Sequence, residues 1–330
     1  SPEQVAELSR ELQTFARENG HDLPLVIGVD QEGGRVARMG PPWTVWPPLR
    51  ALGRIGSEDM ARRMGEALAS ECLAAGINCD FVPDLDVDTN PDNPIIGNRS
   101  FGADPDLVGR LGAAMVRGLQ GRRVIGSAKH FPGHGDTEKD SHLELPVVDQ
   151  PRSRLFDVEI RPFRKAIEAG VATVMMAHVL YPDLDPDLPA SLSPKVVEDI
   201  LRRELRYDGV VMTDDLEMKA VAAQWGPAVS AVLAMKAGCD VVPVCGASPH
   251  PQVEAIEGVI RALEEEQLSW DSLDAAGTRV RRMKERFLLP YIKNLKLLGI
   301  DATFRVVIAV PWARDPNLVR DIAICSTEEL

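Results

Sequence analysis

Fourteen consecutive residues, from Lys129 to His142, concentrate side chains that can do chemistry. They read KHFPGHGDTEKDSH and hold three histidines, three acidic residues and two glycines. Histidine and carboxylate groups held close together can bind a metal ion, transfer a proton or hold a polar ligand. The residues just before them, 124–128, form an apolar run of the length expected for a buried strand.

A metal site is the first chemistry to weigh. Zinc binds imidazoles such as those of His130, His134 and His142. However, the proline and glycines between them indicate a loop rather than a ligand-bearing helix, and Lys129 adds a positive charge. The glycines of DQEGGR, residues 30–35, lack the spacing of a phosphate-binding loop, and the sequence has no G-x-S-x-G nucleophile turn. We therefore predict neither a metal ion nor another cofactor.

Glycoside hydrolysis fits these residues better. It requires a carboxylate on one face of the sugar, a proton donor on the other, and polar groups for the hydroxyls. Asp214 is the candidate carboxylate, and Asp140 with His142 offers an acid–imidazole pair on a loop whose glycines are expected to let it move. The charged side chains suited to holding hydroxyl groups are Asp30, Arg35, Arg99, Lys129 and His130. For His134 we expect a hydrogen bond that stabilises the loop.

The elements that must position these residues alternate between short apolar runs and amphipathic stretches. Expected strands lie at residues 25–29, 78–82, 124–128, 172–177, 209–212 and 240–244. Expected helices lie at residues 2–18, 57–75, 105–120, 151–168, 194–204, 227–237 and 252–265. This alternation is typical of an α/β protein with a parallel sheet, and the number of units favours a (β/α)8 barrel over a doubly wound sheet.

Ionisable residues follow five successive predicted strands at the point where each strand ends. They include Asp30, Lys129 with His130, His178 and Asp214. The carboxyl ends of parallel strands meet on one rim of a barrel, where active sites are built. Each acid alone could instead cap the next helix, as Asp215 might, but lysine and histidine are poor caps. The pattern therefore predicts an active site on that rim.

The ends of the sequence predict an unusual barrel. Ser1 stands as the N-cap of the first helix, so we expect an incomplete first βα unit and a natural N-terminus further upstream. Residues 1–288 are expected to form one catalytic domain, and residues 289–330 a C-terminal tail. Within that tail, residues 304–310 have the pattern of one more strand. We expect this strand to pack against the barrel and cover its open edge.

Composition limits the partners. The chain has 330 residues and a net charge of −13, which argues against nucleic acid or an anionic membrane as a partner. No apolar run approaches the roughly 18 residues of a membrane span. Five cysteines without C-x-x-C spacing favour reduced thiols in the cytoplasm, with secretion left open. Five tryptophans and three tyrosines are few for a long polysaccharide groove, so we expect removal of one terminal sugar. We also expect the protein to be a monomer.

Four segments together resemble glycoside hydrolase family 3. They are VDQEGGRV, GNRSFG, KHFPGHGDTEKDSH and MTDDLEM, and the third is the most specific. The chain is most similar to the single-domain β-N-acetylhexosaminidase branch, which includes the cytoplasmic enzyme of peptidoglycan recycling. The resemblance covers roughly residues 1 to 285. It implies a (β/α)8 barrel and a retaining mechanism through a glycosyl-enzyme intermediate.

The resemblance also implies roles for individual residues. Asp214 matches the nucleophile, His142 the general acid/base and Asp140 its paired carboxylate. The residues that match those holding a terminal N-acetylglucosamine are Asp30, Arg35, Arg99, Lys129 and His130. Three alternatives stay open: a phosphorylase using the same site, another family 3 β-glycosidase, and a sugar-binding barrel without activity.

Overall fold

A parallel sheet built in sequence order forms the centre of the molecule. The computed structural model describes residues 1–138, 140–141, 144–246 and 248–289. Each strand of this sheet pairs in parallel with the next, in the order β1-β4-β5-β6-β7. A parallel bridge from Met212 to Val241 adds a sixth extended segment at the far edge. The five strands are β1 (Gly28–Val29), β4 (Cys79–Asp80), β5 (Ile125–Phe131), β6 (Thr173–Met176) and β7 (Val210–Thr213).

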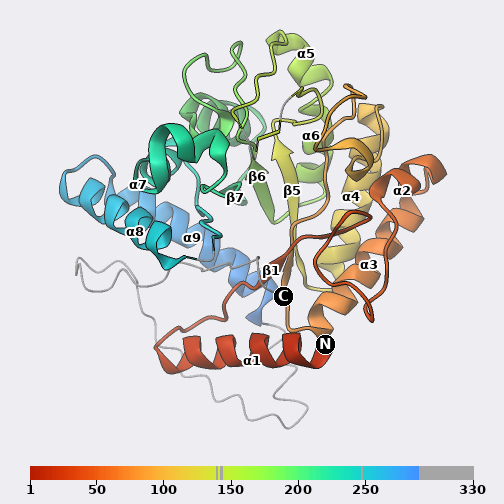
Figure 1. Cartoon of the computed structure of the whole chain (residues 1–330), viewed down its shortest axis with the longest axis horizontal. Coiled ribbons are helices and arrows are strands. Elements are labelled where there is room, and N and C mark those ends of the chain that lie inside the picture. Colours follow the sequence, from red (N-terminus) through yellow and green to blue (C-terminus); the bar gives the residue numbers. More distant parts are fainter. Residues whose placement is uncertain (139, 142–143, 247, 290–330) are drawn as a thin grey trace.

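Helices connect the strands and cover the outside of the sheet (Figure 1). The α-helices before β6 are α1 (Pro2–Glu18), α2 (Leu49–Ile55), α3 (Glu58–Ala74), α4 (Pro105–Gly121), α5 (Arg152–Asp157) and α6 (Arg161–Glu168). The later ones are α7 (Lys219–Ala237), α8 (Pro249–Glu264) and α9 (Trp270–Phe287). Short 3₁₀ helices η1 (Gly97–Arg99) and η2 (Ala190–Leu192) and the π-helix η3 (Lys195–Glu204) complete the set. The predicted α/β class with a parallel sheet is confirmed.

Polar caps explain where several helices begin. The side chains of Ser57, Asp104, Ser248 and Ser269 accept hydrogen bonds from the first turns of α3, α4, α8 and α9. Ser1 forms a capping box with Gln4 at the start of α1, as its position in the sequence predicts. These caps satisfy amide groups that a helix start leaves unpaired, so the loops that reach the rim end at defined points.

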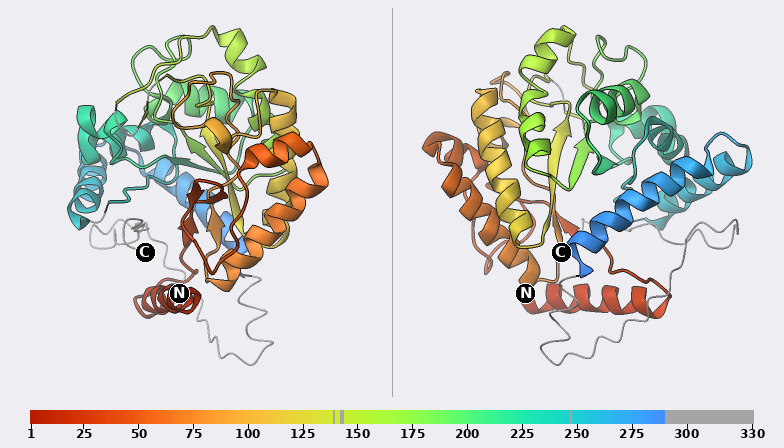
Figure 2. Two further views of the ribbon diagram at one scale, coloured as in Figure 1. Left: turned by 45° about the vertical axis from the view of Figure 1, so that its right-hand side comes forward. Right: turned by 180° about the vertical axis from the view of Figure 1, so that it is seen from behind.

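Helix α9 packs across the ends of the strands that lie opposite the rim (Figure 2). Its Met283 and Phe287 form an apolar cluster with Cys79, Ile125 and Val210, which begin β4, β5 and β7, and with Ala172, which immediately precedes β6. Arg281 of α9 also pairs with Asp22, just after α1. The sequence prediction missed this helix, because its apolar residues are sparse among charged ones and only their spacing marks a buried face.

Other expectations need correction. The single helix expected at residues 151–168 is two helices, α5 and α6, because the chain turns at Val158–Ile160 and directs Glu159 and Ile160 into the interior. Residues 31–37, for which no element was predicted, form an antiparallel hairpin of β2 (Gln31–Gly33) and β3 (Val36–Ala37). The predicted strand at 304–310 lies outside the described residues. No helix among the described residues is long and apolar enough to cross a membrane.

Candidate active site

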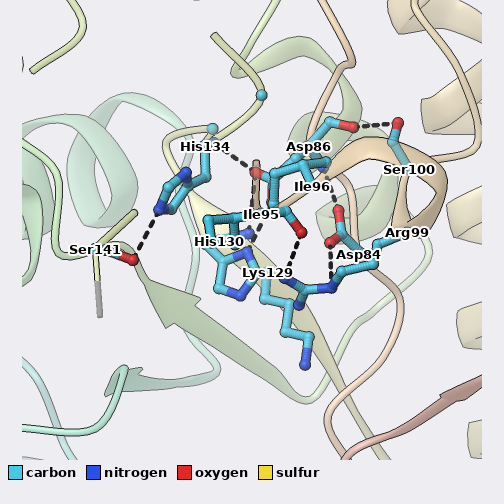
Figure 3. A network of polar contacts seen from close by, with 12 residues as sticks. Asp84, Asp86, Ile95, Ile96, Arg99, Ser100, Lys129, His130, His134 and Ser141 are labelled. Atoms are coloured by element: carbon cyan, nitrogen blue, oxygen red, sulfur yellow. Dashed lines mark hydrogen bonds and ion pairs between the residues drawn. The ribbon is translucent and has the colours of Figure 1, made fainter. Parts of the chain in front are cut away.

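Charged side chains from separate elements meet at the carboxyl ends of the strands (Figure 3). Lys129 and His130 lie near the end of β5, just before its last residue Phe131, and Asp30 follows β1 directly. The segment after β4 brings Asp84 and Asp86 to the same place, where an isolated parallel bridge pairs Asp84 with Lys129. The sequence therefore located the rim correctly, although two of its most important side chains, Glu32 and Asp86, had no predicted role.

Glu32 on β2 forms ion pairs with two buried cations of the site, Arg99 and Lys129. Its carboxylate accepts two hydrogen bonds from Arg99, at 2.8 and 2.9 Å, in a bidentate arrangement. The Lys129 ammonium lies 2.7 Å from Glu32 Oε1 and 2.5 Å from Asp30 Oδ1. The Glu32 and Lys129 side chains are only 1 % and 2 % exposed, whereas Asp30 is 27 % exposed. Asp30 is therefore the carboxylate of this group that a ligand can reach.

Electrostatics keep these groups ionised despite their burial. Burial alone would raise the pKa of Glu32, but the charges of Lys129 and Arg99 outweigh it and lower that pKa to about 2. Burial likewise opposes the charge on Lys129, yet Asp30 and Glu32 together raise its pKa above the ordinary value. Glu32 and Lys129 therefore stay charged over the whole physiological pH range.

Asp86 organises the two histidines of the loop that follows. Its Oδ2 atom lies 2.7 Å from His130 Nδ1. Its Oδ1 atom accepts hydrogen bonds from the backbone N–H groups of His130, at 3.3 Å, and His134, at 2.6 Å. Burial would raise the pKa of Asp86, but the His130 charge and these hydrogen bonds lower it to about 2.

Asp84 behaves differently from its neighbour. Burial, together with the nearby negative charge of Asp86, raises the pKa of Asp84 to about 8, even though Arg99 Nε lies 3.6 Å away. Among the described residues, Asp84, Asp86 and His130 offer ligand atoms within 4.8 Å of one another. Asp86 and His130 are already hydrogen-bonded to each other, and the Arg99 cation lies beside Asp84. A metal ion therefore fits this cluster poorly. The absence of a metal remains a prediction.

Asp214 follows β7 and faces the same rim. Its backbone N–H donates to Met176 O at 3.1 Å, and its Oδ1 accepts from the Asp215 N–H at 2.9 Å. Burial would raise the pKa of Asp214, but the positive charge of His130, together with smaller contributions such as the hydrogen bond from the Asp215 N–H, outweighs it and lowers that pKa. Asp214 is therefore held as a carboxylate.

Asp215 has a structural position instead. Its Oδ1 accepts hydrogen bonds from the backbone N–H groups of Glu217, at 3.1 Å, and Cys245, at 3.0 Å. Its own carbonyl oxygen lies 2.9 Å from His178 Nε2. The side chain therefore ties the end of β7 to the neighbouring segment, which is more than the simple helix cap that its sequence position suggested.

The loop after β5 is packed tightly through its first half. A Cβ atom on Gly135 would lie 1.8 Å from the Val87 carbonyl oxygen, so only glycine fits there. The buried Tyr181 hydroxyl donates to Gly133 O at 2.6 Å, and the Asn93 amide donates to the carbonyls of His134 and Gly135. The two glycines therefore permit close packing, contrary to our expectation that they let the loop move.

His134 is hydrogen-bonded at both ring nitrogens. Nδ1 lies 2.9 Å from Thr137 Oγ1, and Nε2 lies 3.0 Å from Ser141 Oγ. Burial lowers the pKa of this ring to about 4, so it is neutral near pH 7. The predicted stabilising role agrees with this geometry. Asp140, beside Ser141, is among the described residues, whereas the predicted general acid His142 lies outside them.

Arg35 is not brought into the charged cluster. Its exposed guanidinium contacts the carbonyl oxygens of Pro94, Ile95 and Ile96, in the loop that leads to Arg99. It therefore supports the loop that carries Arg99. Its predicted contact with a sugar remains an expectation.

A parallel α/β barrel with buried charges on its rim defines an enzyme for a polar substrate. Residues 1–283 match the glycosyl hydrolase family 3 N-terminal domain. The chain is 40 % identical over 258 residues to a β-hexosaminidase of Thiobacillus denitrificans, covering 76 % of this chain and 69 % of that protein. It belongs to glycoside hydrolase family 3. The predicted family, the (β/α)8 barrel class and the enzyme class are thereby confirmed.

Solved structures agree with this assignment. A family 3 β-N-acetylglucosaminidase from Paenibacillus sp. is 42 % identical with a TM-score of 0.85, covering 96 % of this chain and 59 % of that one. A β-N-acetylhexosaminidase from Beutenbergia cavernae is 31 % identical with a TM-score of 0.76, covering 84 % of both chains. The chain thus spans about three fifths of the Paenibacillus enzyme, so the activity of the whole protein is a matter for proposal.

The contacts of Glu32 with Lys129 and Arg99, here called the Glu32 clamp, yield a first prediction. Glu32→Gln removes the charge between Lys129 and Arg99, so we expect kcat/KM to fall by about 10²-fold or more through weaker substrate binding. Asp240→Asn is the matched control, since Asp240 is a fully buried carboxylate between Arg202, at 2.6 Å, and Arg279, at 2.8 Å. Steady-state kinetics and thermal unfolding should show lower stability in both variants but lost activity only in Glu32→Gln. Equal activity in the two would contradict the role of the clamp.

Proposed function

We propose that this chain is a retaining, exo-acting β-N-acetylhexosaminidase that removes terminal N-acetylglucosamine from glycans such as peptidoglycan fragments. Its relatives support the β-hexosaminidase activity. The observation that carries the proposal is the buried array of fixed charges beside Asp214 at the strand ends. The terminal sugar, its stereochemistry and the natural glycan are inferred from the family resemblance.

Substrate binding rests on the polar array. A sugar ring presents several hydroxyl groups, each of which donates and accepts a hydrogen bond. Asp30 can accept from such hydroxyls, while Lys129 and Arg99 can donate to them. Because Glu32 already holds both cations in place, binding a sugar requires little further ordering of these long side chains. A preorganised site of this kind favours one terminal sugar in one orientation.

Asp214 then acts as the nucleophile. One carboxylate oxygen forms a bond to the anomeric carbon while the bond from that carbon to the leaving oxygen breaks with its electron pair. The leaving oxygen takes a proton from the general acid. In the second step water attacks the same carbon, gives its proton to the same group acting as base, and releases Asp214 as a carboxylate. Two inversions at one carbon give net retention.

His142 is our candidate for the general acid/base, with Asp140 as its partner. Geometry argues against two other histidines near the rim. His134 is hydrogen-bonded at both ring nitrogens, and His178 likewise lies 2.7 Å from Ser191 Oγ and 2.9 Å from Asp215 O. Both rings are buried and have lowered pKa values, because burial disfavours their charged forms. Neither is free to exchange protons with a leaving group.

The activity test uses an aryl N-acetyl-β-glucosaminide with and without inorganic phosphate. We expect release of the aryl alcohol with free N-acetylglucosamine as the sugar product, at a rate independent of phosphate. Formation of N-acetylglucosamine 1-phosphate would identify a phosphorylase. Faster turnover of the corresponding glucoside would indicate another family 3 β-glycosidase. Binding of the sugar without turnover would leave a sugar-binding barrel.

Asp214→Ala should abolish most of this turnover. Loss of the nucleophile is expected to reduce kcat by about 10³-fold or more, which corresponds to about 4 kcal/mol of the barrier. Asp215→Ala is the neighbouring control and should lose less, because its side chain supports the backbone. Measurement of kcat for both purified variants decides the matter. A larger loss in Asp215→Ala would move the nucleophile by one residue.

His142→Ala should slow the enzyme selectively. General acid help is typically worth 10²–10⁴-fold, and an activated aryl leaving group departs without it. We therefore expect kcat/KM to fall by about that factor for poor leaving groups and much less for good ones, with Asp140→Ala following the same pattern more mildly. His250→Ala, on the exposed surface of α8, is the control. An equal loss across a leaving-group series would show that His142 is not the acid.

A further inference from the structure

Asp86 has no place in the reaction as written, yet it is one of the most completely bonded groups on the rim. Its side chain is fully buried and 2.7 Å from His130 Nδ1. Two backbone N–H groups, of His130 and His134, complete its contacts. An ionised carboxylate is stable in the interior only with such partners, and within the described part of the chain the side chain that hydrogen-bonds to Asp86 is the His130 imidazole.

The surroundings of His130 decide its protonation. The charged or titratable groups that face its ring are Asp84, Asp86, Arg99, His134 and Asp214. Of these, Arg99 opposes a second proton on the ring. Asp86 favours it most strongly, because it combines an opposite charge with a short hydrogen bond. Burial would lower the pKa of His130, but Asp86 outweighs it and the net direction is upward.

The other ring nitrogen is the one a substrate can use. Within the described residues no protein group is hydrogen-bonded to His130 Nε2. With Nδ1–H donated to Asp86, a second proton on the ring must stand on Nε2. A charged Nε2–H is a stronger hydrogen-bond donor than a neutral one.

We propose that Asp86 is a positioning residue that holds His130 as a doubly protonated cation, with Nε2–H as a charged donor for the substrate. The role within the reaction rests on the proposed function, whereas the state of the ring does not. The same positive charge is the largest favourable influence on Asp214, so Asp86 also acts through His130 to keep the nucleophile ionised.

The state of the ring can be measured without substrate. In ¹⁵N-histidine-labelled protein, the imidazole resonances report protonation of each nitrogen, and loss of a signal in His130→Gln assigns the ring. We expect His130 to remain doubly protonated well above pH 6.5, the approximate midpoint of an unperturbed histidine. In Asp86→Asn its midpoint should fall by at least about one pH unit, because the carboxylate charge is gone.

Asp84→Asn is the matched control. It is the same substitution two residues away, at an equally buried carboxyl that is already largely protonated near pH 7. The His130 midpoint should therefore change much less in this variant. A wild-type midpoint at or below about 6.5, or equal midpoints in wild type and Asp86→Asn, would overturn the proposal. The wild-type measurement decides even if the variant does not fold.

A kinetic test separates this proposal from the proposed function. With an activated aryl substrate, which needs no proton from His142, kcat/KM should decline at high pH as His130 loses its proton. In Asp86→Asn that decline should begin at lower pH, by about the amount found by NMR. At low pH the substitution should not increase kcat/KM, because His130 is protonated there in both proteins. If kcat/KM declines at the same high pH in wild type and in Asp86→Asn, the role of Asp86 is overturned. Absence of turnover in wild type would overturn only the proposed activity.

Discussion

Burial of two cations beside one carboxylate is the constraint on which the rest of the site depends. Lys129 and Arg99 come from distant parts of the chain, and neither could lie in the interior without a counter-charge. Glu32 supplies it to both, from a hairpin 67 residues before Arg99. The hairpin, the β5 strand and the η1 turn are therefore locked together by one interaction. Because the charges are fixed before a sugar arrives, little of the binding energy is lost in arranging them.

Two aspartates separated by one residue show how strongly local contacts set chemical character here. Asp86 receives three hydrogen bonds and has a pKa of about 2, while Asp84, beside that negative charge, has a pKa of about 8. Near pH 7 the pair therefore carries roughly one negative charge instead of two. This limits repulsion within a cluster that must also keep Asp214 ionised. The segment after β4 thus tunes the electrostatics of the rim.

The position of the rim residues can be predicted because the ends of the strands can be recognised in the sequence. Apolar runs followed by Asp30, Lys129 with His130, and Asp214 place those groups correctly, since parallel strands carry their ends to one side. Glu32 was missed because it lies in a short hairpin next to glycines, where no periodicity marks a strand. The tight packing of the glycine-rich loop was missed because glycine permits both freedom and close approach. Only the opposing backbone distinguishes the two.

Helix α9 has a consequence for biosynthesis. Its Arg281 pairs with Asp22 across 259 residues of sequence, and its last turn covers the starts of four strand segments. During translation at roughly 5–20 residues per second, about 10 to 50 seconds pass between the emergence of these two residues. Throughout that interval α9 is not yet available to pack on the apolar residues at the strand starts. This apolar cluster can therefore be completed only late in synthesis, by a non-local packing step.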